Sequence, residues 1–449
     1  MKGIKSFHFF IEIYFYLIYH ICTRKFKKDR KMKLKLHTKI ILFILIFLFS
    51  FQSLSFAASP KITATSAILV EVSTGRILYE KNSTKQMYPA SVTKILTAIV
   101  VLENSKLDDI VTVHESSIQS VPDGYVTCDL HDGEELSVKD LLYALLVKSA
   151  NDAAYVLAEH IGGSIEGFAE MMNNKAKEIG CNNSHFVNPN GIHDEEQYTT
   201  AYDLYLMADY AMKNETFRSI VATTSYTLPS TNMHQDKDRT FKNTNELLNK
   251  NSKSYYYSNA IGIKTGFTSE AGECLVAQSS RDGLEFISVV LDSSLTPEGL
   301  HGRFIDTKKL FNYAYDNFTL TKIREKNTLV DTIEIENATK DTKNLDVVIE
   351  DSITIITKKD LDVDNLIPEI SYKENLLAPI TKGTQVGTIK YKVDDIEYSA
   401  NLLANTDVEE QINYSIFIIA FALLLIGIII LHRQQLKQKR RRKSSRARR

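Results

Sequence analysis

Three short groups of polar residues carry side chains that are able to perform nucleophilic catalysis. The first is Ser91-Val92-Thr93-Lys94, in which a hydroxyl and an amine lie three positions apart. Residues three apart share one face of a helix, so Lys94 is placed to act as the base that a serine nucleophile requires. The residues after Lys94 are mostly apolar, which indicates a buried helix. A buried serine and lysine need polar partners, so we infer a chemical role for this pair.

The second and third groups are Ser149-Ala150-Asn151 and Lys264-Thr265-Gly266. Taken singly, the three patterns are common, because they also occur on a helix surface, at a helix cap and at an exposed strand end. Their occurrence in this order, each at a suitable predicted element, is far more specific. The combination predicts one catalytic site in which Ser91 is the nucleophile and Lys94 its base.

The elements that position these groups follow from the apolar pattern and from turn and cap residues. Ser137 to Asp140 resembles a capping box at the start of a helix. The predicted helices are 91–104, 137–148, 152–161, 200–212 and 307–318, and the predicted strands are 65–72, 76–80, 262–268, 273–279 and 284–292. This succession predicts an α+β fold with an antiparallel sheet and a cluster of helices. The second polar group would lie in the joint between two helices, and the third on a strand.

The remainder of the folded chain predicts a second, smaller unit that is rich in β-strands. Short alternating segments separated by Asn, Asp and Lys turns occupy residues 319–405, and no catalytic group is evident among them. The strands predicted there are 329–335, 345–349, 353–356, 385–393 and 397–403. We expect a spacer or interaction module, followed by a linker at residues 406–413.

Charge is segregated along the chain although its formal sum is only −1. Residues 1–57 hold 11 Lys and Arg against two acidic residues, and residues 432–449 hold 10 Lys and Arg and no acidic residue. The central part is therefore acidic, which argues against nucleic acid as its partner. Residues 32–58 combine a basic start, an apolar run and small residues, which predicts a signal peptide. We interpret residues 1–31 as an over-extended start, with Met32 the true one, or as an extra N-terminal segment.

The apolar run at residues 414–431 is uncharged and just long enough to cross a bilayer. A strongly basic tail follows at residues 432–449, so the positive-inside rule predicts a cytoplasmic tail and an extracytoplasmic body. The sequence therefore predicts a cell-membrane protein with a single C-terminal span.

Cysteine and histidine contents give no support for a disulfide framework or a metal centre. Cys22, Cys128, Cys181 and Cys274 include no C-x-x-C spacing, so we expect buried free thiols. Metal-ligand types occur at 131–135 and 193–196, but without H-E-x-x-H spacing. We expect both segments to be solvated turns, with no metal and no cofactor at the site.

Four segments of the chain resemble the low-molecular-weight penicillin-binding proteins, the serine-type D-alanyl-D-alanine carboxypeptidases. The resemblance covers roughly residues 59–431, and Ala150 is a departure, since some relatives carry Gly or Asp at that position. It implies a β-lactamase-like catalytic domain at residues 59–318, a small all-β domain and a C-terminal membrane attachment. The segments that carry it are Pro89–Lys94, Leu145–Ala154, Phe186–Gly191 and Gly262–Thr268.

The resemblance also implies a role for each site residue. Ser91 would attack the carbonyl of the penultimate D-Ala, and a neutral Lys94 would accept its proton, with its pKa lowered by burial and by Lys264. Ser149 would relay the proton, and Asn151 would bind the amide of the substrate. Lys264 and Thr265 would recognise the terminal carboxylate, and Gly266 would allow the substrate to approach closely. The backbone N–H groups of Ser91 and Phe267 would donate hydrogen bonds to the oxyanion. The implied partners are peptidoglycan stem peptides, β-lactam antibiotics as inhibitors, and the membrane.

Three alternatives remain open from the sequence. A class A β-lactamase needs a glutamate that activates water, and Glu246-Leu247-Leu248-Asn249 has spacing one residue short of that pattern. A catalytically inactive wall-binding protein is disfavoured because the three groups are intact. A zinc carboxypeptidase is the third alternative, and insensitivity to a chelator would exclude it.

Overall fold

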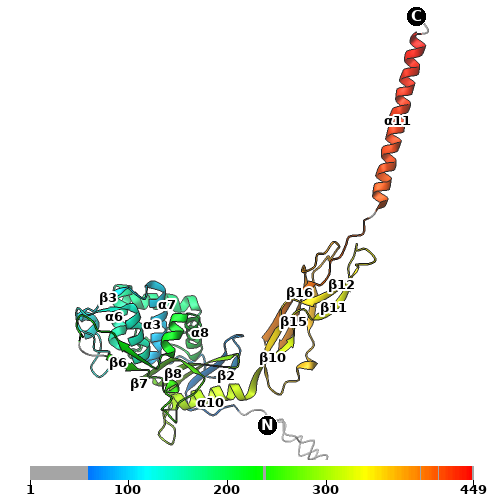
Figure 1. Cartoon of the computed structure of the whole chain (residues 1–449). Coiled ribbons are helices and arrows are strands. Elements are labelled where there is room, and N and C mark those ends of the chain that lie inside the picture. Colours follow the sequence, from blue (N-terminus) through cyan, green and yellow to red (C-terminus); the bar gives the residue numbers. More distant parts are fainter. Residues whose placement is uncertain (1–58, 236–238, 395, 413, 447–449) are drawn as a thin grey trace, which may run out of the picture. The chain divides into compact units, whose positions relative to one another are not determined.

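The computed structural model describes residues 59–235, 239–394, 396–412 and 414–446, with side chains up to residue 440. The predictions for residues 1–31 and 32–58 lie outside these ranges. Within them, a helix-and-sheet portion is followed by an all-β portion and then by one long helix (Figure 1). The predicted order of an α+β domain, a small β domain and a C-terminal helix is confirmed.

The first portion is built on a five-stranded antiparallel sheet in the order β2-β1-β9-β8-β7. Side chains alternate between the two faces of a strand, and both faces of β1 are buried. Ile68 and Val70 join one hydrophobic core, whereas Ala67 and Leu69 join the other. The strands are β1 (Ser66–Glu71), β2 (Ile77–Lys81), β7 (Ala260–Thr268), β8 (Gly272–Arg281) and β9 (Leu284–Ser293).

A cluster of helices covers one face of this sheet, and α10 (Gly302–Asn317) covers the other, as Figure 1 shows. All residues of α3 from Lys94 to Val101 are buried, so this helix lies inside the cluster. The other helices are α4 (Glu115–Gln119), α5 (Val138–Tyr143), a π-helical turn (Ala144–Lys148), α6 (Asn151–Gly162), α7 (Ile165–Ile179), α8 (Ala201–Met212) and α9 (Glu215–Ala222).

Short elements complete the first portion. Two small antiparallel pairs join β3 (Ile110–Thr112) to β4 (Glu135–Ser137) and β5 (Ser225–Leu228) to β6 (Arg239–Lys242). The 3-10 turns are Ala90–Thr93, directly before α3, and Glu246–Leu248. The chain therefore enters α3 through a tighter turn, and Ser91 lies in that turn rather than in the α-helix.

Several local predictions are confirmed, and a few are wrong in their bounds. Ser137 caps α5 by accepting a hydrogen bond from the backbone N–H of Asp140, as the capping box predicts. The last helix of this portion starts at Gly302 rather than at Thr307. Helices α7 and α9 have no counterpart among the predicted helices. In α7 the residues Phe168, Ala169, Met172 and Ala176 are buried, and Ile165, Met171 and Ile179 pack against the core, so an apolar pattern at helical spacing was present there in the sequence.

The second portion is all β and contains the five predicted strands together with two more. A five-stranded antiparallel sheet has the order β11-β12-β16-β15-β14, and β10 pairs with β13. Strand β10 follows α10 without a turn residue, and β14 is largely exposed, so neither gives a clear pattern in the sequence. The strands are β10 (Phe318–Arg324), β11 (Leu329–Glu334), β12 (Asn344–Ile349), β13 (Ile353–Lys358), β14 (Glu369–Tyr372), β15 (Gln385–Val393) and β16 (Ile396–Ala404), and a 3-10 turn spans Val363–Asn365.

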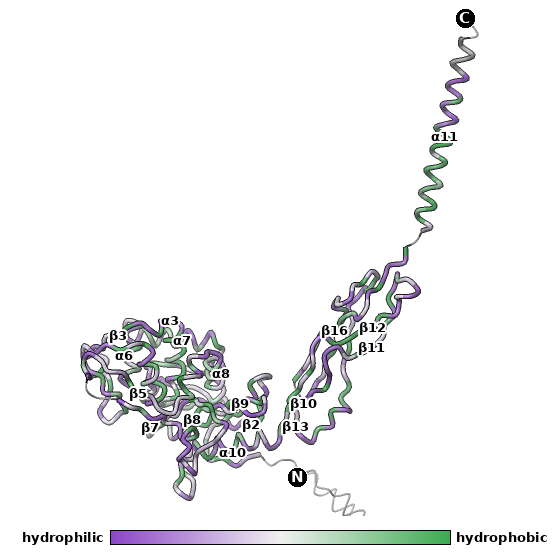
Figure 2. Tube along the Cα trace, in the orientation of Figure 1, coloured by the Kyte–Doolittle hydropathy of each residue, from purple (hydrophilic) through white to green (hydrophobic). Residues whose placement is uncertain are grey.

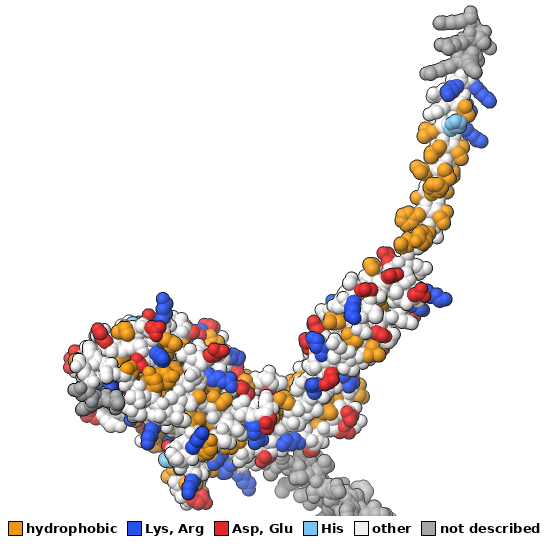
Figure 3. All heavy atoms as spheres, viewed as in Figure 1, with side chains coloured by type: hydrophobic (Ala, Val, Ile, Leu, Met, Phe, Trp, Pro, Cys, Tyr) orange, Lys and Arg blue, Asp and Glu red, His pale blue; other side chains and the backbone are white. Residues whose placement is uncertain are grey.

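The C-terminal helix α11 (Tyr414–Arg446) is the one helix among the described residues that is long and apolar enough to cross a membrane. Its candidate span is Tyr414–Arg440, with a mean hydropathy of 3.0 in the most apolar window. Its first part is apolar in Figure 2, and lysine and arginine side chains follow in Figure 3. The helix does not stop at Leu431 but continues into the segment predicted as a tail.

Candidate active site

Ser91 lies at the start of the buried helix, in a backbone segment held from two sides. Ala90 has a positive φ of 48°, which is uncommon for a residue with a side chain. The hydroxyl of Thr93 donates a hydrogen bond to the carbonyl of Ala90 at 2.9 Å. Gly191 packs so closely that a Cβ atom there would lie 1.8 Å from the same carbonyl oxygen. The loop around Gly191 therefore fixes the backbone next to Ser91.

The side chain of Lys94 is fully buried and its amine nitrogen has three polar neighbours. Nζ lies 2.9 Å from Oγ of Ser91, 2.9 Å from Oδ1 of Asn151 and 2.7 Å from the carbonyl oxygen of Asn190. The first and second polar groups of the sequence thus meet at this nitrogen. The carbonyl of Asn190 belongs to the segment Phe186–Gly191, but the sequence does not predict its role.

Both buried lysines of the site have lowered pKa values. Burial lowers the pKa of Lys94 well below its usual 10.5, and the positive charge of Lys264 lowers it further, although Asp152 acts in the opposite direction. Burial, together with the charge of Arg303, lowers the pKa of Lys264 to about 7. The surroundings of Lys94 therefore favour its neutral form in the folded protein.

The second polar group lies at the joint between the π-helical turn and α6. Ser149 has a left-handed backbone with φ of 67°, which ends the turn and lets α6 begin in a new direction. Asn151 is the first residue of α6. Its backbone N–H and its side-chain Nδ2 both donate to the carbonyl oxygen of Val126, at 2.8 and 2.9 Å. Both polar atoms of the Asn151 side chain therefore have protein partners.

The third polar group lies on β7, an edge strand of the sheet. Nζ of Lys264 donates to the carbonyl of Thr265 at 3.0 Å, and the hydroxyls of Thr265 and Thr244 are 2.6 Å apart. A Cβ atom on Gly266 would lie 3.1 Å from the backbone nitrogen of Ser91. The absence of a side chain at Gly266 is what allows β7 to approach the nucleophile.

The three groups border one cavity of about 500 Å³. Of the predicted site residues, Ser91, Ser149, Asn151, Thr265, Gly266 and Phe267 line it, and Lys94 and Lys264 are buried beside it. The side chain of Phe267 is exposed. All eight predicted site residues thus belong to one region of the structure.

Several other parts of the cavity wall are not among the predicted site residues. They are the loop Asp123–Val126, Gly191, Ile192, Thr244, Thr268, Ser269 and Arg303. Nη1 of Arg303 donates to the carbonyl of Gly266 at 3.1 Å. Gly191 ends the segment Phe186–Gly191, which carries the resemblance, so a signal for it existed in the sequence. Arg303 gives none, because its position depends on how α10 packs against the sheet.

Comparison with known protein families identifies the family to which this chain belongs. Residues 54–294 match the family described as D-alanyl-D-alanine carboxypeptidase, and residues 318–410 match the family described as penicillin-binding protein 5, C-terminal domain. The chain belongs to the D-alanyl-D-alanine carboxypeptidase family. The family match ends before α10 and therefore leaves Arg303 outside it. The resemblance stated from the sequence is confirmed.

Individual relatives and solved structures support the same family assignment. The chain is 34% identical over 336 residues to the D-alanyl-D-alanine carboxypeptidase DacF of Bacillus subtilis, which covers 74% of this chain and 82% of that protein. The crystal structure of penicillin-binding protein 5 from Haemophilus influenzae is 30% identical, with a TM-score of 0.61 over 79% of this chain and all of that one. The Streptomyces K15 DD-transpeptidase structure is 36% identical, with a TM-score of 0.53 over 58% of this chain and all of that one.

Two further sequence predictions concern the cysteines and residues 131–135, and the structure confirms the first and contradicts part of the second. Cys128, Cys181 and Cys274 are buried free thiols, as expected among the described residues. The prediction that residues 131–135 form a solvated turn is wrong at Glu134, which is fully buried. Its carboxylate forms an ion pair with Arg239 and accepts a hydrogen bond from Thr231, and these partners offset the cost of burial.

Proposed function

We propose that this carboxypeptidase removes the terminal D-Ala from peptidoglycan stem peptides ending in D-Ala-D-Ala, through an acyl-enzyme on Ser91. The observation that supports it most is the environment of the Lys94 amine. A neutral amine has two N–H groups and one lone pair. Oδ1 of Asn151 and the carbonyl of Asn190 are both acceptors, so they take the two N–H groups. The lone pair is then left for the hydroxyl proton of Ser91, at an N–O distance of 2.9 Å.

In the first step, Oγ of Ser91 attacks the carbonyl carbon of the penultimate D-Ala while Nζ of Lys94 accepts the hydroxyl proton. The negative oxygen that develops needs donors, which we assign to the N–H groups of Ser91 and Phe267. The short distance between the Gly266 position and the nitrogen of Ser91 supports that assignment, because it brings β7 alongside the nucleophile. The C–N bond to the terminal D-Ala then breaks as the proton passes to the leaving amine, with Ser149 as the relay. Water hydrolyses the remaining ester on Ser91, which releases the shortened peptide and restores the hydroxyl.

The terminal carboxylate of the substrate is the group that Lys264 and Thr265 would recognise. Lys264, buried with a pKa of about 7, is charged in the lower half of the neutral range. The hydroxyls of Thr265 and Thr244 are hydrogen-bonded to each other, which leaves one hydroxyl proton to donate at the cavity wall, and Arg303 adds a second positive charge. Asn151 has a role different from the one implied by the resemblance. We propose that it orients Lys94, because Oδ1 binds Nζ and Nδ2 binds the carbonyl of Val126.

β-Lactam antibiotics would acylate the same serine. A class A β-lactamase releases the drug with a glutamate that activates water, and none of the described residues lining the cavity is a glutamate. The carboxylate of Glu246, the candidate in the sequence, accepts a hydrogen bond from Asn249 at 2.8 Å. We therefore expect a penicillin to remain bound to Ser91 for a long time.

We propose that α11 anchors the protein in the cell membrane, with a basic cytoplasmic tail from residue 432. The positive-inside rule then places the catalytic domain, residues 59–318, and the β domain, residues 319–405, outside the cytoplasm. A linker at residues 406–413 would join them to the span at 414–431. The acidic body and the signal-like residues 32–58 support this orientation.

The decisive experiment measures D-Ala release from a synthetic pentapeptide ending in D-Ala-D-Ala, using the full-length protein in detergent. We expect release that penicillin blocks and a chelator does not. Ser91→Ala should abolish both release and labelling by a fluorescent penicillin. Ser254→Ala, at an exposed serine, is the matched control and should behave like the wild type.

Other outcomes of this experiment would contradict the proposal in distinct ways. Penicillin labelling without any D-Ala release would identify an inactive binding protein. Rapid turnover of penicillin would identify a β-lactamase. Release that survives in Ser91→Ala would show that the nucleophile is wrongly assigned.

A further inference from the structure

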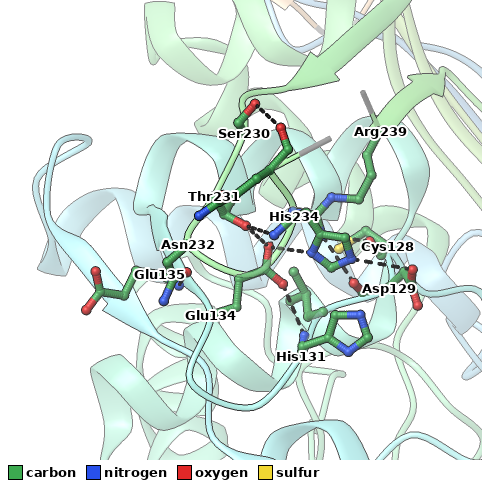
Figure 4. A network of polar contacts seen from close by, with 12 residues as sticks. Cys128, Asp129, His131, Glu134, Glu135, Ser230, Thr231, Asn232, His234 and Arg239 are labelled. Atoms are coloured by element: carbon green, nitrogen blue, oxygen red, sulfur yellow. Dashed lines mark hydrogen bonds and ion pairs between the residues drawn. The ribbon is translucent and has the colours of Figure 1, made fainter. Parts of the chain in front are cut away.

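A second cluster of ionisable side chains lies outside the cavity, between the segment 128–134 and the loop that joins β5 to β6 (Figure 4). His234 is its centre and is only 8% exposed. Nδ1 of its ring is 3.2 Å from Oε1 of Glu134, and Nε2 is 3.7 Å from Oδ2 of Asp129. The ring of His131 stacks on that of His234, with a centroid distance of 4.5 Å and an interplanar angle of 24°.

Glu134 determines which ring nitrogen of His234 faces outward. Its carboxylate is held by the hydroxyl of Thr231 at 2.7 Å, by the backbone N–H of His131 at 3.1 Å and by the guanidinium of Arg239. A carboxylate acceptor beside Nδ1 places the ring proton on that nitrogen. The lone pair of Nε2 is then directed towards Asp129, while the ring of His131 lies over the face of the His234 ring. A histidine oriented in this way by a buried carboxylate is the usual second-layer arrangement at zinc sites.

We propose that Asp129, His131 and His234 bind one divalent transition-metal ion of the zinc class. Each residue offers one ligand atom, and these atoms all lie within 4.8 Å of one another. Two imidazoles and one carboxylate suit zinc and its neighbours and do not suit calcium or magnesium, which prefer oxygen ligands. Ligand atoms on a tetrahedral zinc are roughly 3.3 Å apart, given metal–ligand distances of about 2.0–2.1 Å. Asp129 and His131 are exposed, so their side chains have room to rotate until their ligand atoms converge with Nε2 of His234, and His131 leaves its stacked position when it does so.

The site adjoins the loop that forms one wall of the cavity. The carboxylate of Asp152, the residue after Asn151, accepts hydrogen bonds from the N–H groups of Cys128 and Leu130 at 3.0 and 3.3 Å. Arg239 donates to the carbonyls of Cys128 and Asp129. A metal ion would join this same loop to the β5–β6 connection through His234. It would therefore stabilise the wall formed by Asp123 to Val126 without entering the reaction.

The test titrates Zn²⁺ into the chelator-stripped full-length protein in detergent by calorimetry, with Co²⁺ absorption as a second readout. We expect one saturable equivalent with micromolar or tighter affinity and a visible Co²⁺ spectrum. His131→Ala and Asp129→Asn should each weaken binding by at least tenfold. Both side chains are exposed, so these variants should fold. His160→Ala, at an exposed histidine on α6 outside the cluster, is the matched control and should bind as the wild type does.

A third variant tests the orienting carboxylate. Glu134→Gln should weaken Zn²⁺ binding by roughly 10- to 100-fold while leaving the three ligands in place. If Glu134→Gln does not fold, His131→Ala and Asp129→Asn still test whether the cluster binds Zn²⁺. The proposal is overturned if the wild type takes up no Zn²⁺ equivalent, or if His131→Ala and Asp129→Asn bind Zn²⁺ as tightly as His160→Ala. Neither readout depends on peptidase activity, so failure here would leave the proposed function intact.

Discussion

The amine nitrogen of Lys94 lies 2.9 Å from the hydroxyl oxygen of Ser91, and the two residues are separated by a single helical turn. Their pairing is therefore a local property of the chain. The protonation state of Lys94 is not local, because it depends on burial within the helix cluster and on the charge of Lys264. Local sequence thus supplies the reacting pair, and tertiary packing makes it reactive.

Replacing Lys94 should separate its chemical role from its role in packing. Lys94→Met keeps a long side chain without a base, and Lys94→Arg keeps a group that is always charged. Both should lower the rate of acylation by penicillin by about 10²- to 10⁴-fold. Stopped-flow labelling gives the rate, and circular dichroism verifies the fold. Normal acylation by a folded Lys94→Met protein would exclude Lys94 as the base.

The pH dependence of acylation should show two limbs with opposite causes. Lys94 must be neutral, so the second-order rate constant should rise as pH increases through its lowered pKa. Lys264 must be charged to bind a carboxylate, so the constant should fall above about pH 7, where Lys264 loses its proton. A substrate with a C-terminal amide should lack this alkaline limb. If the amide substrate shows an alkaline limb of the same size, the fall in the rate constant is caused by titration of a group other than Lys264.

Arg303 should control the position of the alkaline limb. Its positive charge is the second cause of the lowered pKa of Lys264, after burial. In Arg303→Gln this charge is lost, so the pKa of Lys264 should rise and the limb should move to higher pH. The readout is the pH midpoint of the limb in the rate profile. A loss of rate with an unchanged midpoint would mean that Arg303 contacts the substrate only.

Gly191 and Gly299 form a matched pair for testing the packing beside Ser91. Both have positive φ, at 84° and 76°, but only Gly191 has a close neighbour, the carbonyl of Ala90. Gly299→Ala should cost about 1–2 kcal/mol, the usual penalty for the backbone conformation alone. Gly191→Ala should cost more than about 3 kcal/mol, because backbone atoms must move. Chemical denaturation followed by circular dichroism compares them, and equal losses would refute the close contact.

Much of the site was predictable because its side chains belong to short patterns with a fixed order. The contribution of main-chain carbonyls was not, since the oxygens of Asn190 and Val126 can be supplied by any residue type. The buried state of Glu134 was also not predictable, because its counter-ion Arg239 lies 105 residues later in the chain. Hydrophobic periodicity predicted most of the well-buried strands and helices, whereas β14 is largely exposed and gave a weak pattern.

The carbonyl oxygen of Val126 accepts both hydrogen bonds that Asn151 donates towards the loop, and Oδ1 of the same asparagine binds the Lys94 amine. Val126 and its neighbour Tyr125 are exposed at the cavity wall. An antibiotic whose bulky substituent displaced this loop would therefore disturb the base through one asparagine. The loop at Tyr125 and Val126 is therefore a second place, besides the Ser91 hydroxyl, at which a drug would act on the catalytic base of this enzyme.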